Sequence, residues 1–162
     1  MKVCTIGRIG FQKNPKMFNE IAEQFPDIEF TWIGEGELRN ELTSKNISIT
    51  GWLERKDVLK ELNKNDIFIL PSLWEGLPIS LLEAMYMKKI CIVSNVIGNR
   101  DVINDYVDGF IVTKLNEYIN IILNIKNKKI KTNEIINNAF NNVINDFSIN
   151  NMKENYKKIY GV

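Results

Sequence analysis

No histidine occurs among the 162 residues of this chain. Because histidine is the commonest metal ligand and the usual acid or base near neutral pH, His-based acid–base chemistry by this chain alone is excluded. Cysteine is almost as scarce, and Cys4 and Cys91 both fall inside apolar runs. That context is typical of small core residues in a reducing compartment rather than of a disulfide or a metal pair. The sequence predicts no metal site.

The chain also lacks an excess of charge of one sign and a long hydrophobic run. Lys+Arg number 21 against 20 Asp+Glu, and the Lys-rich stretch 126–131 is too short to form a binding face for nucleic acid. No apolar stretch approaches the length of a membrane span, and no signal peptide is evident. The 44% hydrophobic and 25% charged residues are usual for a soluble globular protein, and the length indicates one domain, 1–162.

Apolar strand patterns and helical patterns alternate through the first two-thirds of the chain. The strands are apolar on both faces, which is the signature of a parallel sheet covered by helices on both sides. We therefore predict an α/β fold with a Rossmann-like, doubly wound sheet and a helical C-terminal tail. The predicted strands are 2–7, 28–34, 47–51, 66–72, 90–94 and 109–112, and the predicted helices are 14–25, 37–44, 56–63, 78–87 and several after 115.

The loop 7–16 is the first candidate site, since ligands of such folds bind at the carboxyl ends of the strands. Gly7 allows a sharp turn after the first strand, and Arg8 and Lys13 place two cations beside the next helix, which Asn14 can cap. This combination suits a phosphate or diphosphate. A plain surface loop with two basic residues stays an open alternative.

The loop that begins at Gly34 contains a second glycine, Gly36. It resembles a fragment of a dinucleotide-binding fingerprint, but Glu37 follows and no third glycine comes where that fingerprint needs one. The pair is more typical of a tight turn.

Residues 70–85, LPSLWEGLPISLLEAM, contain two carboxylates in unequal settings. Glu75 lies in the turn before a helix, whereas Glu83 lies inside an otherwise apolar helix. Burying a lone carboxylate is costly unless hydrogen bonds reach it, and the vicinal hydroxyls of a ribose or hexose could supply them. The alternative is an internal ion pair of Glu83 with Arg8 or Arg100.

The start of this helix is the other notable feature of the stretch. Pro78 suits the first helical position, where no backbone N–H is needed. The free N–H groups of Ile79 and Ser80 would then face the cleft, and Gly76 would let a ligand approach the backbone closely.

These motifs together resemble the donor-binding C-terminal domain of family 4 retaining glycosyltransferases, also called group 1, which consist of two Rossmann-like domains (the GT-B fold). The likeness covers nearly the whole chain. It is carried by Arg8 with Lys13, Gly34 with Gly36, ITGWL (49–53), NDIFILPS (65–72), the E-x7-E spacing of Glu75 and Glu83, and FSINNMKENYKKIY (147–160).

The resemblance implies a role for each matching residue. Arg8 and Lys13 would hold the donor diphosphate and stabilise the leaving group, Glu75 would contact the transferred sugar, and Glu83 would hold the ribose. The further donor-binding positions would be Gly7, Trp52 and Leu53, the last two against the base, and the backbone of Gly76, Leu77, Ile79 and Ser80.

The implied function is binding of a nucleotide-diphosphate sugar, a UDP- or GDP-sugar, without a metal ion or cofactor. The full-length enzyme would transfer the sugar with retention to an acceptor in cell-surface polysaccharide or glycolipid synthesis. We expect the N-terminal acceptor domain to be absent from this chain. Without that domain, we expect the chain to be inactive. We also expect a cytoplasmic location, with contact to the inner face of the membrane only through the missing domain.

The sequence departs from the family pattern at two places, and other functions stay open. The family usually has a Gly and then a Pro before the fifth strand, where this chain has Lys88 and Ile90. After that strand the family usually has a GGxxE turn, where this chain has IGNRDV (97–102). The alternatives are a nucleotide-sugar epimerase, a phosphorylase, or a non-enzymatic nucleotide-binding or receiver-like module. A phosphorylase would need a lysine for pyridoxal phosphate, and no lysine of this chain is singled out for that role. A receiver would need an acidic cluster after the first strand, where this chain has Gly7 and Arg8.

Overall fold

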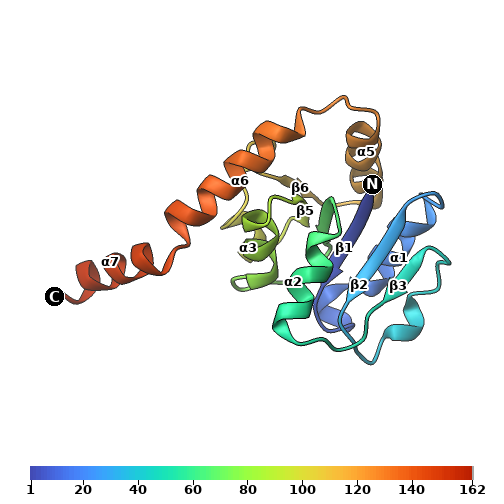
Figure 1. Cartoon of the computed structure of the whole chain (residues 1–162), viewed down its shortest axis with the longest axis horizontal. Helices are drawn as coiled ribbons and strands as arrows, with labels where there is room; N and C mark the ends of the chain where they lie inside the picture. Colours follow the sequence, from blue (N-terminus) through green and yellow to red (C-terminus); the bar gives the residue numbers. More distant parts are fainter. Residues whose placement is uncertain (162) are drawn as a thin grey trace.

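A computed structural model describes residues 1–161 and contains one parallel sheet (Figure 1). Its order, β3-β2-β1-β4-β5-β6, confirms the predicted doubly wound topology. Every pairing between neighbouring strands is parallel. The strands are β1 (Lys2–Ile6), β2 (Glu29–Ile33), β3 (Ile47–Ile49), β4 (Ile67–Leu70), β5 (Ile90–Ser94) and β6 (Phe110–Val112).

Helices cover both faces of the sheet, because successive side chains of each strand point to opposite faces. On one face Val3 and Ile67 pack with α1 (Pro15–Glu23) and α5 (Leu115–Lys126). On the other face Cys4 and Phe68 pack with α2 (Arg55–Asn63), α3 (Ile79–Tyr86) and α6 (Thr132–Asp146). Both cysteines are free and buried, and burial raises the pKa of each thiol, as expected for core residues.

The loops differ from the prediction at two places. The predicted helix 37–44 is only a short 3₁₀ turn, η2 (Arg39–Glu41). It stops because the buried Asn19 side chain accepts hydrogen bonds from the backbone N–H groups of Thr43 and Ser44, both at 2.8 Å, which withdraws them from a helix. In addition, the segment after β5 contains a short helix, α4 (Ile97–Arg100), which the sequence analysis missed.

The start of α1 is as predicted. Asn14 is the N-cap, its side chain accepts a hydrogen bond from the N–H of Met17 at 3.4 Å, and Pro15 occupies the first turn. A second 3₁₀ turn, η1 (Phe11–Lys13), directly precedes this cap. The cap and the turn together fix the shape of the first loop.

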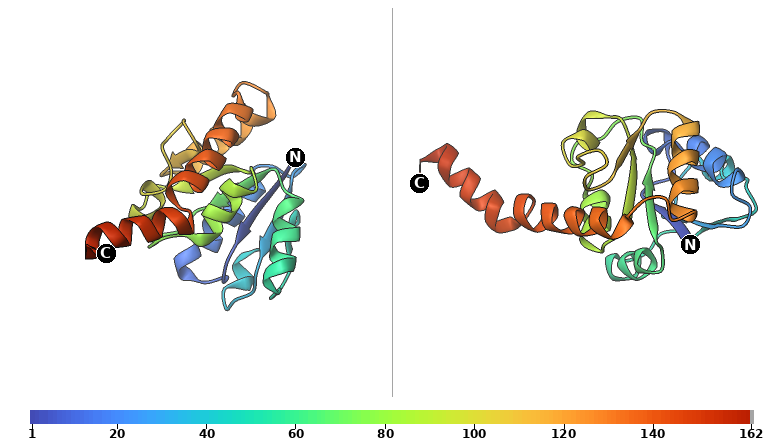
Figure 2. Two further views of the ribbon diagram at one scale, coloured as in Figure 1. Left: turned by 60° about the vertical axis from the view of Figure 1, so that its left-hand side comes forward. Right: turned by 90° about the horizontal axis from the view of Figure 1, so that it is seen from above.

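The predicted helical tail is confirmed and projects away from the sheet. Helix α7 (Ile149–Tyr160) extends beyond α6 and ends far from the other elements, as Figure 1 and the right-hand view of Figure 2 show. It buries no residue, and Ile149, Met152, Tyr156 and Ile159 are exposed along it. No helix within residues 1–161 combines the length and the apolar character needed to cross a membrane.

Lys88 occupies the position where the family resemblance expects glycine, and its backbone explains that expectation. Its φ of 56° lies in the left-handed region, which favours glycine. Its side chain packs on α6, with Nζ 4.9 Å from the centroid of the Phe140 ring and 3.4 Å from Asn137 Oδ1. This packing offsets the backbone strain.

Replacing Lys88 should therefore separate the two effects. Lys88→Ala keeps the strain and loses the contacts, so we expect Lys88→Gly to be more stable than Lys88→Ala by about 1 kcal/mol. Urea denaturation measures both. Lys128 is the matched control, because it has the same φ of 56° and its side chain makes no hydrogen bond or ion pair within residues 1–161. Lys128→Gly should stabilise outright, and equal stability of the two Lys88 variants would contradict the backbone argument.

Candidate functional site

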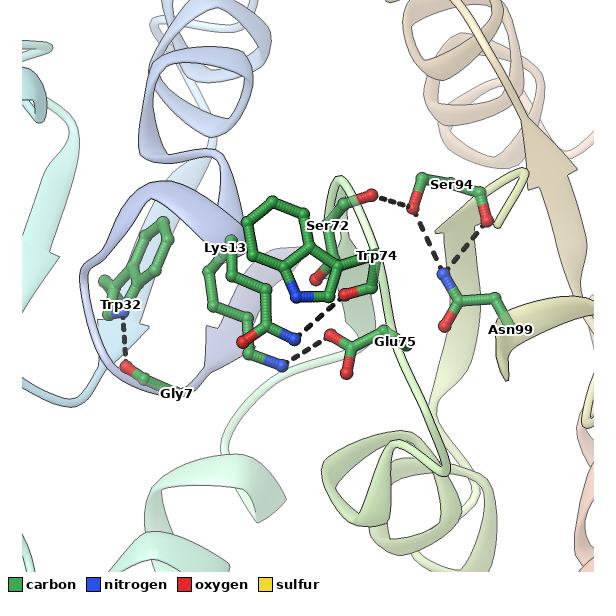
Figure 3. Close-up of polar contacts among 9 residues, drawn as sticks. Gly7, Lys13, Trp32, Ser72, Trp74, Glu75, Ser94 and Asn99 are labelled. Carbon is green, nitrogen blue, oxygen red and sulfur yellow. Dashed lines mark hydrogen bonds and ion pairs between the residues drawn. The ribbon is translucent and has the colours of Figure 1, made fainter. Parts of the chain in front are cut away.

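The site lies at the carboxyl edge of the sheet, where the winding direction changes. Strand β1 pairs with β2 on one side and with β4 on the other. The chain leaves β1 towards β2 and returns to β4 later, so the loops after β1 and β4 lie side by side (Figure 3). Residues of both loops, among them Arg8, Lys13 and Trp74, line a crevice there. Ligands of doubly wound sheets bind at such a point.

Backbone and amide hydrogen bonds join the two loops. The Asn14 side chain donates to the carbonyl of Pro71 at 3.2 Å, and the N–H of Leu73 donates to the carbonyl of Gln12 at 2.8 Å. The Gln12 side chain in turn donates to the carbonyl of Trp74 at 2.9 Å (Figure 3). The position of the second loop is therefore set by the first.

Lys13 and Glu75, two of the predicted site residues, form an ion pair across the joined loops. Lys13 Nζ donates to Glu75 Oε1 at 2.6 Å, and the side chains are only 17% and 6% exposed (Figure 3). Removing one partner of such a pair leaves a buried, uncompensated charge in the site. The crevice thus holds a neutral pair rather than an isolated cation.

Arg8 points outward beside the same crevice. Its guanidinium is 78% exposed and donates from Nε to Glu37 Oε2 at 2.9 Å. The backbone amide of Glu37, followed by the hydrogen bond from Arg8, lowers the pKa of the Glu37 carboxyl. Glu37 therefore stays ionised at neutral pH and competes with any anionic ligand for Arg8. The sequence analysis gave Glu37 no such role.

The two glycines after β2 allow that loop to touch the backbone of the first loop. A Cβ on Gly34 would lie 2.1 Å from the carbonyl oxygen of Gly7, and one on Gly36 would lie 2.3 Å from that of Ile9. The indole N–H of Trp32 donates to the same Gly7 carbonyl at 2.8 Å. These contacts account for both glycines by close packing of backbones.

The predicted base-binding residues line a cleft between these loops and α2. The cleft has a volume of about 560 Å³, and Trp52, on its rim, is 78% exposed. It brings together four of the predicted site residues, Gly7, Arg8, Trp52 and Leu53, with Ile6, Ile33, Gly34, Glu35, Gly36 and Val58.

Glu83 has an internal partner that the sequence analysis did not identify. Its side chain is 11% exposed and forms an ion pair with Arg55, at the start of α2. The alternative of an internal pair was thus correct in kind, but Arg8 and Arg100 were the wrong partners. The oxygen that faces Arg55 is Glu83 Oε1, which accepts no hydrogen bond within residues 1–161. No spacing signal links Arg55 to Glu83, because they lie on different helices.

The start of α3 has free amide groups. Pro78 is the N-cap rather than the first helical residue, because its carbonyl accepts from the N–H groups of Leu81 and Leu82 while its own ψ of 95° is extended. Within residues 1–161 no hydrogen bond engages the N–H groups of Gly76, Leu77, Ile79 and Ser80. A Cβ added at Gly76 would meet nothing within 4 Å.

Helix α4 supports the Glu75 loop from its other side. A Cβ on Gly98 would lie 1.8 Å from the carbonyl oxygen of Gly76 and 2.7 Å from that of Glu75. The buried Asn99 side chain donates to the backbone carbonyl and the hydroxyl of Ser94 at 2.9 and 3.1 Å, which anchors α4 on β5 (Figure 3). Gly98 lies in the IGNRDV segment that differs from the family pattern, so the departure preserves one essential glycine.

The fold and the site define a Rossmann-like α/β domain with a polar crevice between the ends of β1 and β4. The chain belongs to the glycosyl transferases group 1 family, which matches residues 1–142. It is 34% identical, over 96% of its length, to the UDP-Gal:alpha-D-GlcNAc-diphosphoundecaprenol alpha-1,3-galactosyltransferase of Escherichia coli, of which it covers 44%. The chain thus spans less than half the length of this curated relative.

Two solved structures share the fold. Anabaena Alr3699/HepE, crystallised with UDP, superposes with a TM-score of 0.88 at 18% identity. The match covers 99% of this chain and 49% of the Anabaena protein. The C-terminal domain of a group 1 family glycosyl transferase (LpcC) from Francisella tularensis superposes with a TM-score of 0.77 at 22% identity. That match covers 91% of this chain and 86% of the Francisella domain.

Alanine at Gly98 and at Gly76 should have opposite effects on folding. Gly98→Ala places a methyl group against backbone atoms that cannot yield easily, so we expect a loss of stability of about 1–3 kcal/mol. Gly76→Ala adds the same methyl group in open space and should leave stability nearly unchanged. Thermal unfolding of both variants measures the contrast, and equal melting temperatures would show that α4 does not support the Glu75 loop.

Proposed function

We propose that residues 1–162 form the nucleotide-sugar-binding, C-terminal domain of a two-domain retaining glycosyltransferase, whose N-terminal acceptor domain lies outside this chain. The observation that carries the proposal is the Lys13–Glu75 pair, which places a cation for the diphosphate beside a carboxylate for the sugar. The 44% coverage of the Escherichia coli relative and the separately solved Francisella domain support the division into two domains.

The donor diphosphate would lie between Lys13, Arg8 and the free amides at the start of α3. An ammonium has three N–H donors, and Lys13 uses one of them on Glu75, so it can bind a phosphate oxygen without releasing the carboxylate. These groups would stabilise the charge that develops on the leaving diphosphate. The cations and amides of this domain would therefore give the charge stabilisation that a metal ion gives in other enzymes.

The sugar hydroxyls would bind the second oxygen of Glu75 and the amides near Gly76, which lies open to a ligand. The ribose hydroxyls would bind the Glu83 carboxylate in competition with Arg55, whose side chain is 66% exposed. The base would lie in the cleft beside Trp52 and Leu53, where the exposed indole offers a stacking face. Uridine is favoured as the nucleoside because the Escherichia coli relative uses a UDP-sugar by its name.

Transfer would require the second domain, which would bring the acceptor across the crevice. The acceptor of the Escherichia coli relative is a sugar diphosphate on undecaprenol, by its name. This supports action on a lipid-linked or cell-surface glycan. The proposed location, in the cytoplasm at the inner face of the membrane, comes from the sequence resemblance alone. We carry retention of configuration over from the sequence resemblance to family 4 retaining glycosyltransferases.

Lys13→Ala should weaken UDP binding to the isolated chain by about 1.5–3 kcal/mol, the scale of a charge-assisted hydrogen bond. Uridine, which lacks the diphosphate, should lose much less, and isothermal titration calorimetry compares the two ligands. Because Lys13→Ala also leaves Glu75 buried and unpaired, Lys13→Ala/Glu75→Gln serves as a folded second variant. Equal losses for UDP and uridine would overturn the diphosphate role.

Glu37→Gln should tighten UDP binding, because it frees Arg8 from its competing carboxylate. We expect a gain of about two- to five-fold, the scale of an exposed ion pair, that shrinks as salt is added. Glu41→Gln is the control, since Glu41 makes no ion pair within residues 1–161. Unchanged affinity of Glu37→Gln would mean that Arg8 does not reach the diphosphate.

A further inference from the structure

Two exposed aromatic rings lie at the carboxyl edge, one from each of the joined loops. Phe11 is 69% exposed and Trp74 is 52% exposed, and their ring centroids are 5.9 Å apart at an angle of 54°. Neither ring is needed to fill the core, and exposed aromatic groups of this kind mark recognition sites. Neither residue is among those assigned to the donor above.

The backbone beneath both rings is fixed. Phe11 begins the 3₁₀ turn η1, and Trp74 is bound through its carbonyl to the Gln12 side chain at 2.9 Å. The N–H of Leu73 is bound to the Gln12 carbonyl at 2.8 Å. The rings are therefore presented by a rigid edge, so a ligand that stacks on them need not order the backbone first.

The rings form the apolar wall of a small, otherwise polar hollow of about 280 Å³. Its other walls include Arg8, Gln12, Lys13 and Glu37. A pyranose ring has the matching character, since its C–H bonds carry partial positive charge towards an aromatic face while its hydroxyls point outward to polar groups. The volume lies below the range of roughly 300–1,000 Å³ typical of larger ligands, which suits a single sugar ring.

We propose that Phe11 and Trp74 form a stacking platform for the acceptor sugar, an inference that rests on the proposed function. The hollow shares Arg8 with the cleft that contains Trp52, but no other residue. It also borders Lys13, the partner of Glu75, and Trp74 adjoins Glu75 in the chain (Figure 3). A sugar on the platform would thus lie outside the cleft that contains Trp52. It would lie beside the transferred sugar and the diphosphate, because Arg8 and Lys13 also line the hollow.

The three tryptophans of this chain offer a direct test, because each reports on a different place. Trp52 lies at the cleft, Trp74 on the platform, and Trp32 is buried. The chain is labelled with 5-fluorotryptophan, and Trp52→Phe and Trp74→Phe assign the fluorine resonances. UDP should shift the Trp52 resonance, and methyl glucoside, methyl galactoside or their 2-acetamido analogues, added to the UDP-saturated chain, should shift that of Trp74. Trp32 should not respond to the glycosides.

Variants and control ligands make the test specific. Phe11→Ala should weaken the glycoside response of Trp74 by about 2- to 10-fold and leave UDP affinity unchanged. Tyr106→Ala is the matched control, because Tyr106 is 64% exposed and also packs on a neighbouring ring, Phe110. Glycerol, a polyol without a ring face, should leave Trp74 unchanged.

The outcomes separate the two proposals. If UDP shifts Trp52 but no glycoside shifts Trp74, the platform is overturned and the donor site stands. The platform is also overturned if phospholipid vesicles shift Trp74 while glycosides do not, or if Tyr106→Ala weakens the glycoside response as much as Phe11→Ala. If UDP leaves Trp52 unchanged, the proposed function fails, and the assignment of the platform to an acceptor fails with it.

Discussion

The parallel pairing of β1 with β4 is the constraint on which the rest of the crevice depends. It places the loop 7–14 beside the loop 71–78, although the two are far apart in the sequence. Four hydrogen bonds then join residues 12–14 to residues 71–75. Because a single residue, Gln12, makes two of these contacts, one through its side-chain amide and one through its backbone carbonyl, the second loop takes its shape from the first.

The same geometry explains why ionisable groups are tolerated at this edge. Lys13 is paired with Glu75, Arg8 with Glu37 and Arg55 with Glu83, so each cation near the crevice already has a carboxylate partner. Pairing lowers the cost of partial burial. In the proposed function, the donor's binding free energy is the gain from its contacts with these cations minus the loss of their contacts with the carboxylates. That loss differs between the buried Lys13 pair and the exposed Arg8 pair.

Close approach between backbones is the second requirement of the site. Gly34 and Gly36 let the loop after β2 touch the first loop, and Gly98 lets α4 touch the Glu75 loop. Gly76 differs from these three, since no protein atom lies where its side chain would be. A glycine that no packing contact requires is consistent with space reserved for a ligand.

The sequence by itself determined the alternation of strands and helices and the parallel sheet. It could do so because apolar periodicity and the Asn14-Pro15 cap are local signals. Only the tertiary structure decided that Arg55 is the partner of Glu83 and that Glu37 holds Arg8, because an ion pair between separate elements leaves no trace in spacing. It likewise decided the failure of the helix 37–44, since the group that ends it, Asn19, belongs to α1. Local propensity fixes most of the elements, whereas contacts between distant segments decide where an element stops and which charges and rings face one another.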